Sequence, residues 1–447
     1  MNDVGHPFLR GLLARRSPLA PTAPTAPTTL TAPSVSWLLA LRAEALERGS
    51  TLAVPTTRDE DWRFTDLAPL TRTGFGPVTA VPTLGADALA PFHIPEAGAR
   101  LVFVDGCFSA ALSMVTPRGD GLIAGSLAAA FDTHDELLHT HLTRLADFRD
   151  DAFTAVNTAH LHDGALIVTD VGHAAPQPVH VLHISTLAGV AIHPRLLVVA
   201  HRDSDLTVIE DHVSLHDGAC LSNAVSEIAV AAGARVRHVK LQRAGKAAFH
   251  VATTATHVER DARYHAVGIA LGARLSRENV HVVQAGTGTD CQLDGLALIG
   301  GRQIADTHSF VDHALPDGTS RQLHKCIAAG AAHAVFNGRV LVREGAQRTD
   351  SAQQCRSLLL SGKAHIDAKP QLEIFADDVK CSHGAAIGQL DADEVFYLRT
   401  RGLDEVAARN VLTYAFAAEI AGRIPVRSVV ERLRAEVLQQ TGAREIA

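Results

Sequence analysis

Two residues near the C-terminal end of the chain, Cys381 and His383, carry side chains that bind soft metals. They stand two positions apart in LEIFADDVKCSHGA, a segment that reads as a β-strand ending at a glycine. Because successive side chains of a strand point to opposite faces, the thiol and the imidazole should project to the same face. Iron, zinc and copper(I) all accept this combination of ligands.

Two ligands do not complete a metal site. Further ligands would have to come from elsewhere in the fold or from another chain. The alternative is a buried free thiol that packs as a small apolar group, next to a histidine bonded to Asp377 or Asp378. The spacing of Cys381 and His383 alone favours this second interpretation.

The nucleotide-binding motifs of the chain are incomplete. In AGTGTDC the third glycine of a dinucleotide fingerprint is replaced by Cys291, and Gly245-Lys246 is followed by an alanine without the upstream glycine of a P-loop. We therefore expect no ATP hydrolysis by this chain. The histidine pairs His212/His216 and His308/His313 have no third ligand that the sequence identifies, so they are interpreted as hydrogen-bonded histidines.

Composition excludes several classes of function. The net charge is −7, which argues against a nucleic-acid or anionic-membrane surface. No apolar run is long enough to span a bilayer, and no signal peptide is recognisable at the N-terminus. The six cysteines form no C-x-x-C pair, which favours a reducing, cytoplasmic compartment.

Between residues 164 and 390 the sequence is built from short strand-like segments such as VHVLHIS, RLLVVAHR and ENVHVVQA. A corner phrase of glycine or aspartate, alanine, a variable residue and an apolar residue recurs between them, at Gly164, Gly218, Gly233, Asp261 and Gly272. Repeated corners without intervening helices predict a mainly β chain that forms a solenoid, a β-helix. A β-sandwich is the alternative.

The chain divides into four predicted parts: a disordered tail (1–34), a helix-rich N-terminal domain (35–163), the β-helix core (164–390) and a C-terminal helical domain (391–447). The tail contains SPLAPTAPTAPTTLTAP, which is too rich in Pro, Thr and Ala to bury much surface. Removing residues 1–33 should therefore leave the melting temperature unchanged. In the last part, Asp391 and Asp404 are the expected N-caps of helices whose apolar stripes would cap the open end of the solenoid.

Three runs of sequence carry a resemblance to a known family: DTHSFVDHALPDGTSRQLHK, AVFNGRVLVREGAQRTD and KPQLEIFADDVKCSHGAAIGQLDADEVFYLRTRGL. They resemble the SufB/SufD family of iron–sulfur cluster assembly proteins, and its SufD branch most closely. The upstream DEDWRFTDL also looks like the N-terminal segment of that family. The resemblance implies a right-handed parallel β-helix flanked by helical N- and C-terminal domains.

The resemblance also implies a function and partners. The chain would be a non-catalytic scaffold subunit that pairs with a SufB-type paralogue through the β-helix and with a SufC-type ATPase through the C-terminal helices. Cys381 and His383 match positions that contribute to a transient iron or iron–sulfur cluster at the interface with the paralogue. Reduced flavin is possible in such a complex, and a homodimer is possible for the isolated chain.

Two alternatives remain open. A SufB-type subunit would carry an acidic phrase in place of the KCSHG segment, so the thiol of Cys381 favours the SufD branch. A β-helix enzyme acting on carbohydrates would need clustered carboxylates and exposed aromatic residues, but aromatic residues make up only 4% of this chain.

Overall fold

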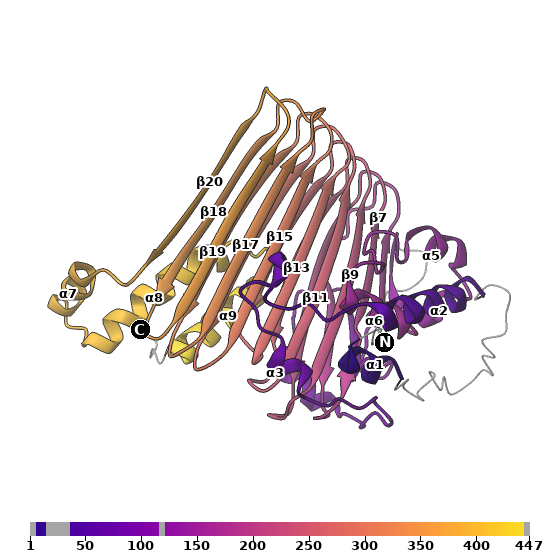
Figure 1. Cartoon of the computed structure of the whole chain (residues 1–447), viewed down its shortest axis with the longest axis horizontal. Helices are drawn as coiled ribbons and strands as arrows, with labels where there is room; N and C mark the ends of the chain where they lie inside the picture. The colour runs from indigo at the N-terminus through magenta and orange to yellow at the C-terminus, as the bar shows by residue number, and fades with distance from the viewer. Residues whose placement is uncertain (1–5, 15–35, 116–120, 442–447) are drawn as a thin grey trace.

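The computed structural model describes residues 6–14, 36–115 and 121–441, and its centre is a β-solenoid (Figure 1). Two ten-stranded sheets make up its walls, and from β8 onward the chain alternates between them, one strand to each sheet per turn. Neighbouring turns pair in parallel and in register. The prediction of a mainly β chain that forms a right-handed parallel β-helix flanked by helices is confirmed.

Within each sheet the strands follow one another along the solenoid. The first sheet contains β2 (Cys107–Phe108), β1 (Ala99–Val104), β5 (Val179–Ser185), β8 (Asp205–Ser214), β10 (Arg235–Arg243), β12 (Arg263–Ala270), β14 (Asp290–Ile299), β16 (Thr319–Ala328), β18 (Asp350–Leu359) and β20 (Lys380–Gly388). The second contains β19 (His365–Ile374), β17 (His333–Val342), β15 (Ile304–His313), β13 (Leu275–Gln284), β11 (Phe249–Val258), β9 (Leu221–Val230), β7 (Arg195–Ala200), β4 (Ala165–Thr169) and β3 (Leu122–Ser126), with β6 (Ala191–Ile192) paired to β9.

The corners of the solenoid repeat one backbone conformation. Gly233 and Asp261, each two residues before a strand of the first sheet, have left-handed φ values of 72° and 58°. Glycine adopts this conformation freely and aspartate tolerates it, which explains the phrase at these two positions. Gly164 and Gly218 carry the same phrase without a left-handed φ value. The phrase at Gly272 is displaced by one residue, because there the left-handed residue is Ala273, with φ of 65°.

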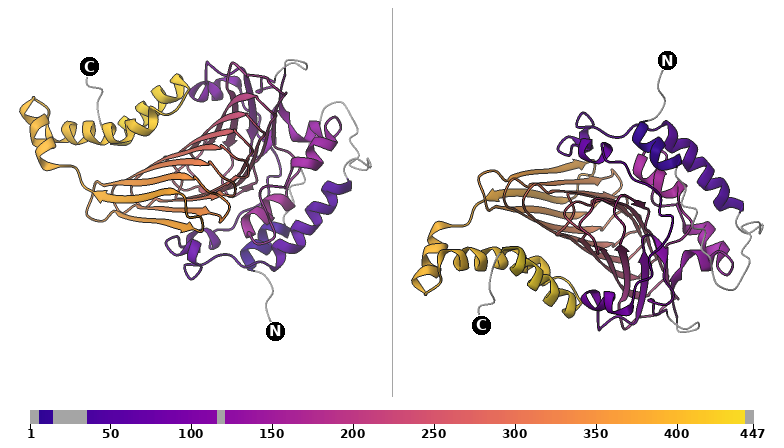
Figure 2. Two further views of the ribbon diagram at one scale, coloured as in Figure 1. Left: turned by 90° about the horizontal axis from the view of Figure 1, so that it is seen from above. Right: turned by 90° about the horizontal axis from the view of Figure 1, so that it is seen from below.

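Short helices cover the N-terminal part of the solenoid (Figure 2). They are α1 (Pro7–Ala14), α2 (Ser36–Thr51), α3 (Ala68–Thr71), α4 (Leu127–Ala130), α5 (Asp135–His141) and α6 (Ala152–Ala159), with 3₁₀ turns at Glu60–Trp62 and Ala86–Phe92. Helices α1, α2 and α6 share one apolar cluster with the ends of β9, β11 and β13. None of the described helices combines the length and the apolarity that a membrane span requires.

The prediction of a disordered tail over residues 1–34 is wrong for Pro7–Ala14. These residues form α1, and Leu9, Leu12 and Leu13 are buried against α2 and α6. The segment PFLRGLLA has enough apolar surface to dock, although the Pro/Thr/Ala tract that follows does not. That tract, residues 15–35, lies outside the described part of the chain.

Removing the buried leucine side chains of α1 should therefore destabilise the protein, contrary to the expectation for a free tail. Leu9 and Leu13 are 0% and 4% exposed, and replacing a buried leucine by alanine typically costs about 2–5 kcal/mol. Urea unfolding of Leu9→Ala and Leu13→Ala should show this loss. Leu39→Ala on the exposed side of α2 is the matched control, with an expected change within about 0.5 kcal/mol. Equal stability of all three variants would mean that α1 is not docked in solution.

Three C-terminal helices complete the fold: α7 (Ala392–Thr400), α8 (Glu405–Ala421) and α9 (Arg427–Thr441). Asp391 and Asp404 cap α7 and α8, as predicted. The expectation that these helices cap the open end of the solenoid is wrong. Instead α8 and α9 run back along its flank (Figure 2), because the outer face of the first sheet carries apolar residues such as Leu241 and Leu296, which these helices bury.

Polar contacts also fix α8 to the solenoid wall. Lys325 of β16 donates to the carbonyl of Phe416 over 2.7 Å and pairs with Glu419. Arg423, just after α8, forms an ion pair of 2.6 Å with Asp294 of β14, which is 1% exposed. These buried or half-buried pairs hold α8 in one orientation on the first sheet.

Candidate functional site

Cys381 and His383 lie on β20, the last strand of the first sheet. They stand in register with Ser351 and Gln353 of β18, which are buried inside the preceding turn. Paired residues of a parallel ladder point to the same side, so both side chains of β20 belong to the face that continues the solenoid interior. The geometry of the pair agrees with the spacing argument, but its role stays a prediction.

The two side chains differ in exposure. Cys381 is half-buried against the apolar cluster of Val340, Val342 and Ala376, whereas His383 is exposed. Burial raises the pKa of the Cys381 thiol above its ordinary value. The sulfur therefore carries its proton at neutral pH, and a bound metal ion would have to displace that proton to form a thiolate ligand.

The end of the solenoid that carries this pair is open. Strands β19 and β20 are the last members of their sheets, so among the described strands each has a neighbour on one edge only (Figure 1). Three large apolar residues are exposed there: Ile374, Phe375 and Ile387, at 40%, 64% and 47%. Unpaired strand edges with exposed apolar side chains are surfaces that another chain can cover.

The other histidines singled out in the sequence are hydrogen-bonded, as predicted. His212 contacts Glu210 over 2.8 Å, and His216 contacts Ser185 over 3.1 Å. His308 contacts Asp306 over 3.1 Å, and His313 contacts Ser320 over 2.9 Å.

Of the remaining cysteines, Cys355 lies on β18, the strand next to β20, and the other four lie on earlier turns. Cys220, Cys291, Cys326 and Cys355 are buried in the solenoid, and Cys107 is half-buried on β2. Desolvation raises the pKa of the Cys291 thiol to about 12, so this group stays protonated. Buried thiols of this kind behave as small apolar side chains.

Sequence reasoning missed a polar cluster inside the solenoid. His183, Glu210, His212, His238 and Lys240 lie on β5, β8 and β10 and are buried. The signal in the sequence is a polar residue among the apolar ones of segments such as VHVLHIS and ARVRHVKLQ, at His183, His238 and Lys240. Alternation normally places polar residues outside, and here these positions point inward instead.

Comparison with known proteins identifies the family. Residues 183–416 match the model described as SUF system FeS cluster assembly, SufBD core domain, and residues 25–181 match the SufBD protein N-terminal region. An iron–sulfur cluster assembly SufBD family protein of Synechocystis is 38% identical over 89% of this chain and 90% of its own length. The iron–sulfur cluster assembly protein SufD of Escherichia coli is 32% identical over 88% of this chain and 89% of its own. The chain therefore belongs to the SufBD family of iron–sulfur cluster assembly proteins.

Proposed function

We propose that the chain is a SufD-type scaffold subunit, in a complex with a SufB-type paralogue and a SufC-type ATPase. In this proposal Cys381 and His383 supply ligands to a nascent iron–sulfur cluster where the chain meets the paralogue. The observation that carries it is the position of a thiol and an imidazole on one face of β20, at the open end of the solenoid. The cluster is cargo, formed and handed on, and the chain itself has no catalytic residue.

The chemistry of the pair suits a site that must release its cargo. Iron–sulfur clusters are held by cysteine thiolates, with histidine as an occasional substitute. Two ligands from one chain hold a cluster weakly, and a partner that supplies the others completes the site only while the chains are together. The raised pKa of the Cys381 thiol also weakens metal binding, because a proton competes with the metal for the sulfur.

We assign the paralogue to the edge formed by β19 and β20. Cys381, His383 and Ile387 alternate on one side of β20, so a chain that covers the exposed Ile387 also closes over the two ligands. When the paralogue is absent, two copies of this chain offer each other the same edge. The isolated chain is therefore expected to form a homodimer.

We assign the ATPase to the C-terminal helices. Phe396 and Tyr397 on α7 and Val406 at the start of α8 are exposed by 65%, 56% and 62%. The contacts of Lys325 and Arg423 tie the neighbouring α8 to the solenoid, so a movement imposed on α7 and α8 would reach the first sheet. ATP hydrolysis belongs to the partner, because the P-loop of this chain is incomplete.

Replacing Phe396 and Tyr397 by aspartate should abolish binding of the SufC-type ATPase. Both side chains are exposed, so the fold should be unaffected, whereas aromatic anchors at an interface are typically worth about 2 kcal/mol or more each. The affinity measured by calorimetry should fall roughly 100-fold or more. Val171→Asp, an exposed apolar residue after β4, is the control and should bind normally. Normal binding by the double variant would remove α7 from the interface.

A further inference from the structure

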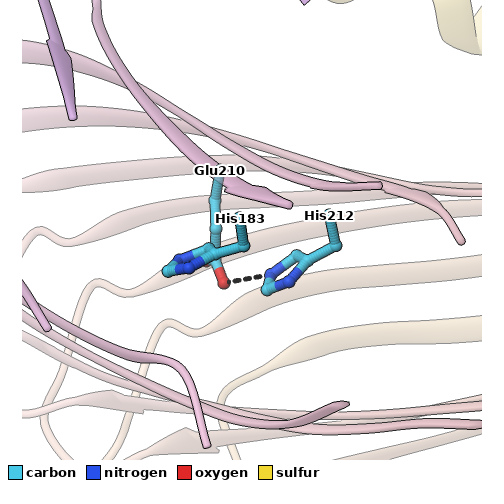
Figure 3. Close-up of side chains that lie close together, drawn as sticks. All are labelled: His183, Glu210 and His212. Atoms are coloured by element: carbon cyan, nitrogen blue, oxygen red, sulfur yellow. Dashed lines mark hydrogen bonds and ion pairs between the residues drawn. The ribbon is translucent and has the colours of Figure 1, made fainter. Parts of the chain in front are cut away.

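Three potential metal ligands meet inside the solenoid, away from the open end (Figure 3). His183 of β5 and His212 of β8 are in register, and Glu210 precedes His212 by two positions on the same inward face. All three are buried, and their potential ligand atoms lie within 4.8 Å of one another. The cluster combines two imidazoles with one carboxylate.

The histidines of this cluster have unused nitrogen atoms. Neither ring nitrogen of His183 has a hydrogen-bond partner among the described residues, and the same is true of Nδ1 of His212. The ring of His183 stacks on Phe103 and on His212, with centroid distances of 5.1 and 4.8 Å. Buried polar atoms without partners are unfavourable, so the imidazole of His183 has a lone pair available for a ligand. The two histidine rings are nearly parallel, at 16°, so one of them turns about its side-chain bonds when both bind a single ion.

The carboxylate of Glu210 is oriented by its neighbours. Its Oε2 accepts from Ser226 over 2.9 Å and from His238 over 3.1 Å, which leaves Oε1 directed toward His212 (Figure 3). Hydrogen bonds of this kind fix metal-binding carboxylates in their working orientation.

The ammonium of Lys240 lies 3.6 Å from Glu210 Oε1 and is the cation nearest to that oxygen in the described interior. It has two other acceptors, Glu278 at 3.0 Å and Thr254 at 3.2 Å. A second cation at Glu210 would therefore not leave the lysine unpaired.

We propose that His183, Glu210 and His212 bind a divalent transition-metal ion of the zinc or iron(II) class inside the solenoid. Two imidazoles and a carboxylate form a ligand set that these ions accept, with a fourth position for water or another imidazole. His250 of β11 is suited to that position, since neither of its ring nitrogens has a partner in the described part of the chain and its ring lies 4.8 Å from that of His212. This site is independent of Cys381 and His383 and of the proposed function.

A second group of possible ligands, His333, His365 and Asp367, lies at the surface of β17 and β19 and carries a weaker argument. Both histidines already bond to Asp367, over 2.7 and 3.2 Å, and His365 is largely exposed. The test must therefore separate surface binding from interior binding. The parent chain for this test carries His365→Ala, Cys381→Ser and His383→Ala, which removes the exposed ligands named above and leaves the interior cluster intact.

The full-length parent chain should be produced in medium containing Co²⁺, so that the ion enters during folding, and then washed with EDTA to strip surface sites. About one cobalt ion per chain should remain, with visible absorption typical of low coordination number. His183→Phe, which preserves the stacking on Phe103, should reduce the cobalt content to background. His324→Phe replaces another buried histidine, one stacked on Phe336 outside the cluster, and should retain the metal.

Two results would overturn the site. One is a folded parent chain without retained cobalt, and the other is a His183→Phe chain that retains as much cobalt as the parent. If His183→Phe does not fold, Glu210→Gln takes its place, since the amide keeps the shape of the side chain and removes the charge. Circular dichroism of each chain shows whether the solenoid has formed.

Discussion

A chain that carries Cys381→Ser together with His383→Ala should fold, join its complex and yet fail to support iron–sulfur cluster formation. Both residues lie on the exposed terminal strand β20, so their replacement removes little packing. Their loss removes every ligand that we assign to the cluster on this chain. Even residues that only orient metal ligands are worth about 10- to 100-fold in affinity or activity, so maturation of a reporter iron–sulfur enzyme in cells should fall by at least this factor.

The single variants show whether the pair acts as a unit. If thiol and imidazole hold the same cluster, the double variant should be little worse than the more severe single one. Cys326→Ser and Cys107→Ser are matched controls, because these thiols lie away from the open end, and both should mature the reporter nearly normally. If the double variant matures the reporter fully, Cys381 and His383 are not cluster ligands but a packed thiol and a solvated histidine.

The strands and corners of the solenoid could be predicted from the sequence because both are local. Alternation of apolar and polar residues in RLLVVAHR or ENVHVVQA has the period of a strand. The left-handed corners at Gly233 and Asp261 require particular residue types, which recur from turn to turn. The resemblance to the SufB/SufD family rests on long and specific segments. The β-helix that it implies agrees with these predicted strands and corners.

Which face of a strand points inward could not be predicted. In β5, Val181 and His183 face the interior, whereas Leu182 between them packs outward under the N-terminal segments. When both faces of a strand are buried, the contrast between an apolar buried face and a polar exposed face disappears, so the alternation no longer shows which face points inward. For this reason the interior cluster around Glu210 was missed, and the outer apolar surface that receives α8 and α9 was not foreseen.

Helix α1 was missed for a different reason. Its eight residues are too few to be stable alone, and it forms because α2 and α6 bury Leu9 and Leu13. The apolar stripe of α9 can be read from its sequence, and its members Val429, Leu433 and Val437 are all buried. Its partner surface, however, is set by tertiary packing that the helix sequence does not encode.

Aspartate at Phe375 and Ile387 should abolish pairing with the SufB-type paralogue. Both side chains are exposed and apolar at the end of the last turn, by 64% and 47%, so charge there costs the isolated chain little. At an interface the same charges would be desolvated without a partner. Central apolar anchors are worth about 2 kcal/mol or more each, so each substitution should weaken the affinity roughly 30-fold and the pair by more.

Analytical ultracentrifugation of the variant mixed with the paralogue measures this effect, and the same run reports the homodimer of the isolated chain. Leu215→Asp, an exposed apolar residue after β8 and far from β20 along the solenoid, is the control and should pair normally. Comparison of Ile387→Asp with Cys381→Ser separates two roles of β20: pairing with the paralogue and binding of the cluster. Loss of pairing should follow from Ile387→Asp alone, whereas Cys381→Ser should leave pairing intact and remove only cluster formation. If Ile387→Asp and Phe375→Asp pair as tightly as the unmodified chain, the paralogue does not bind at the β19–β20 edge.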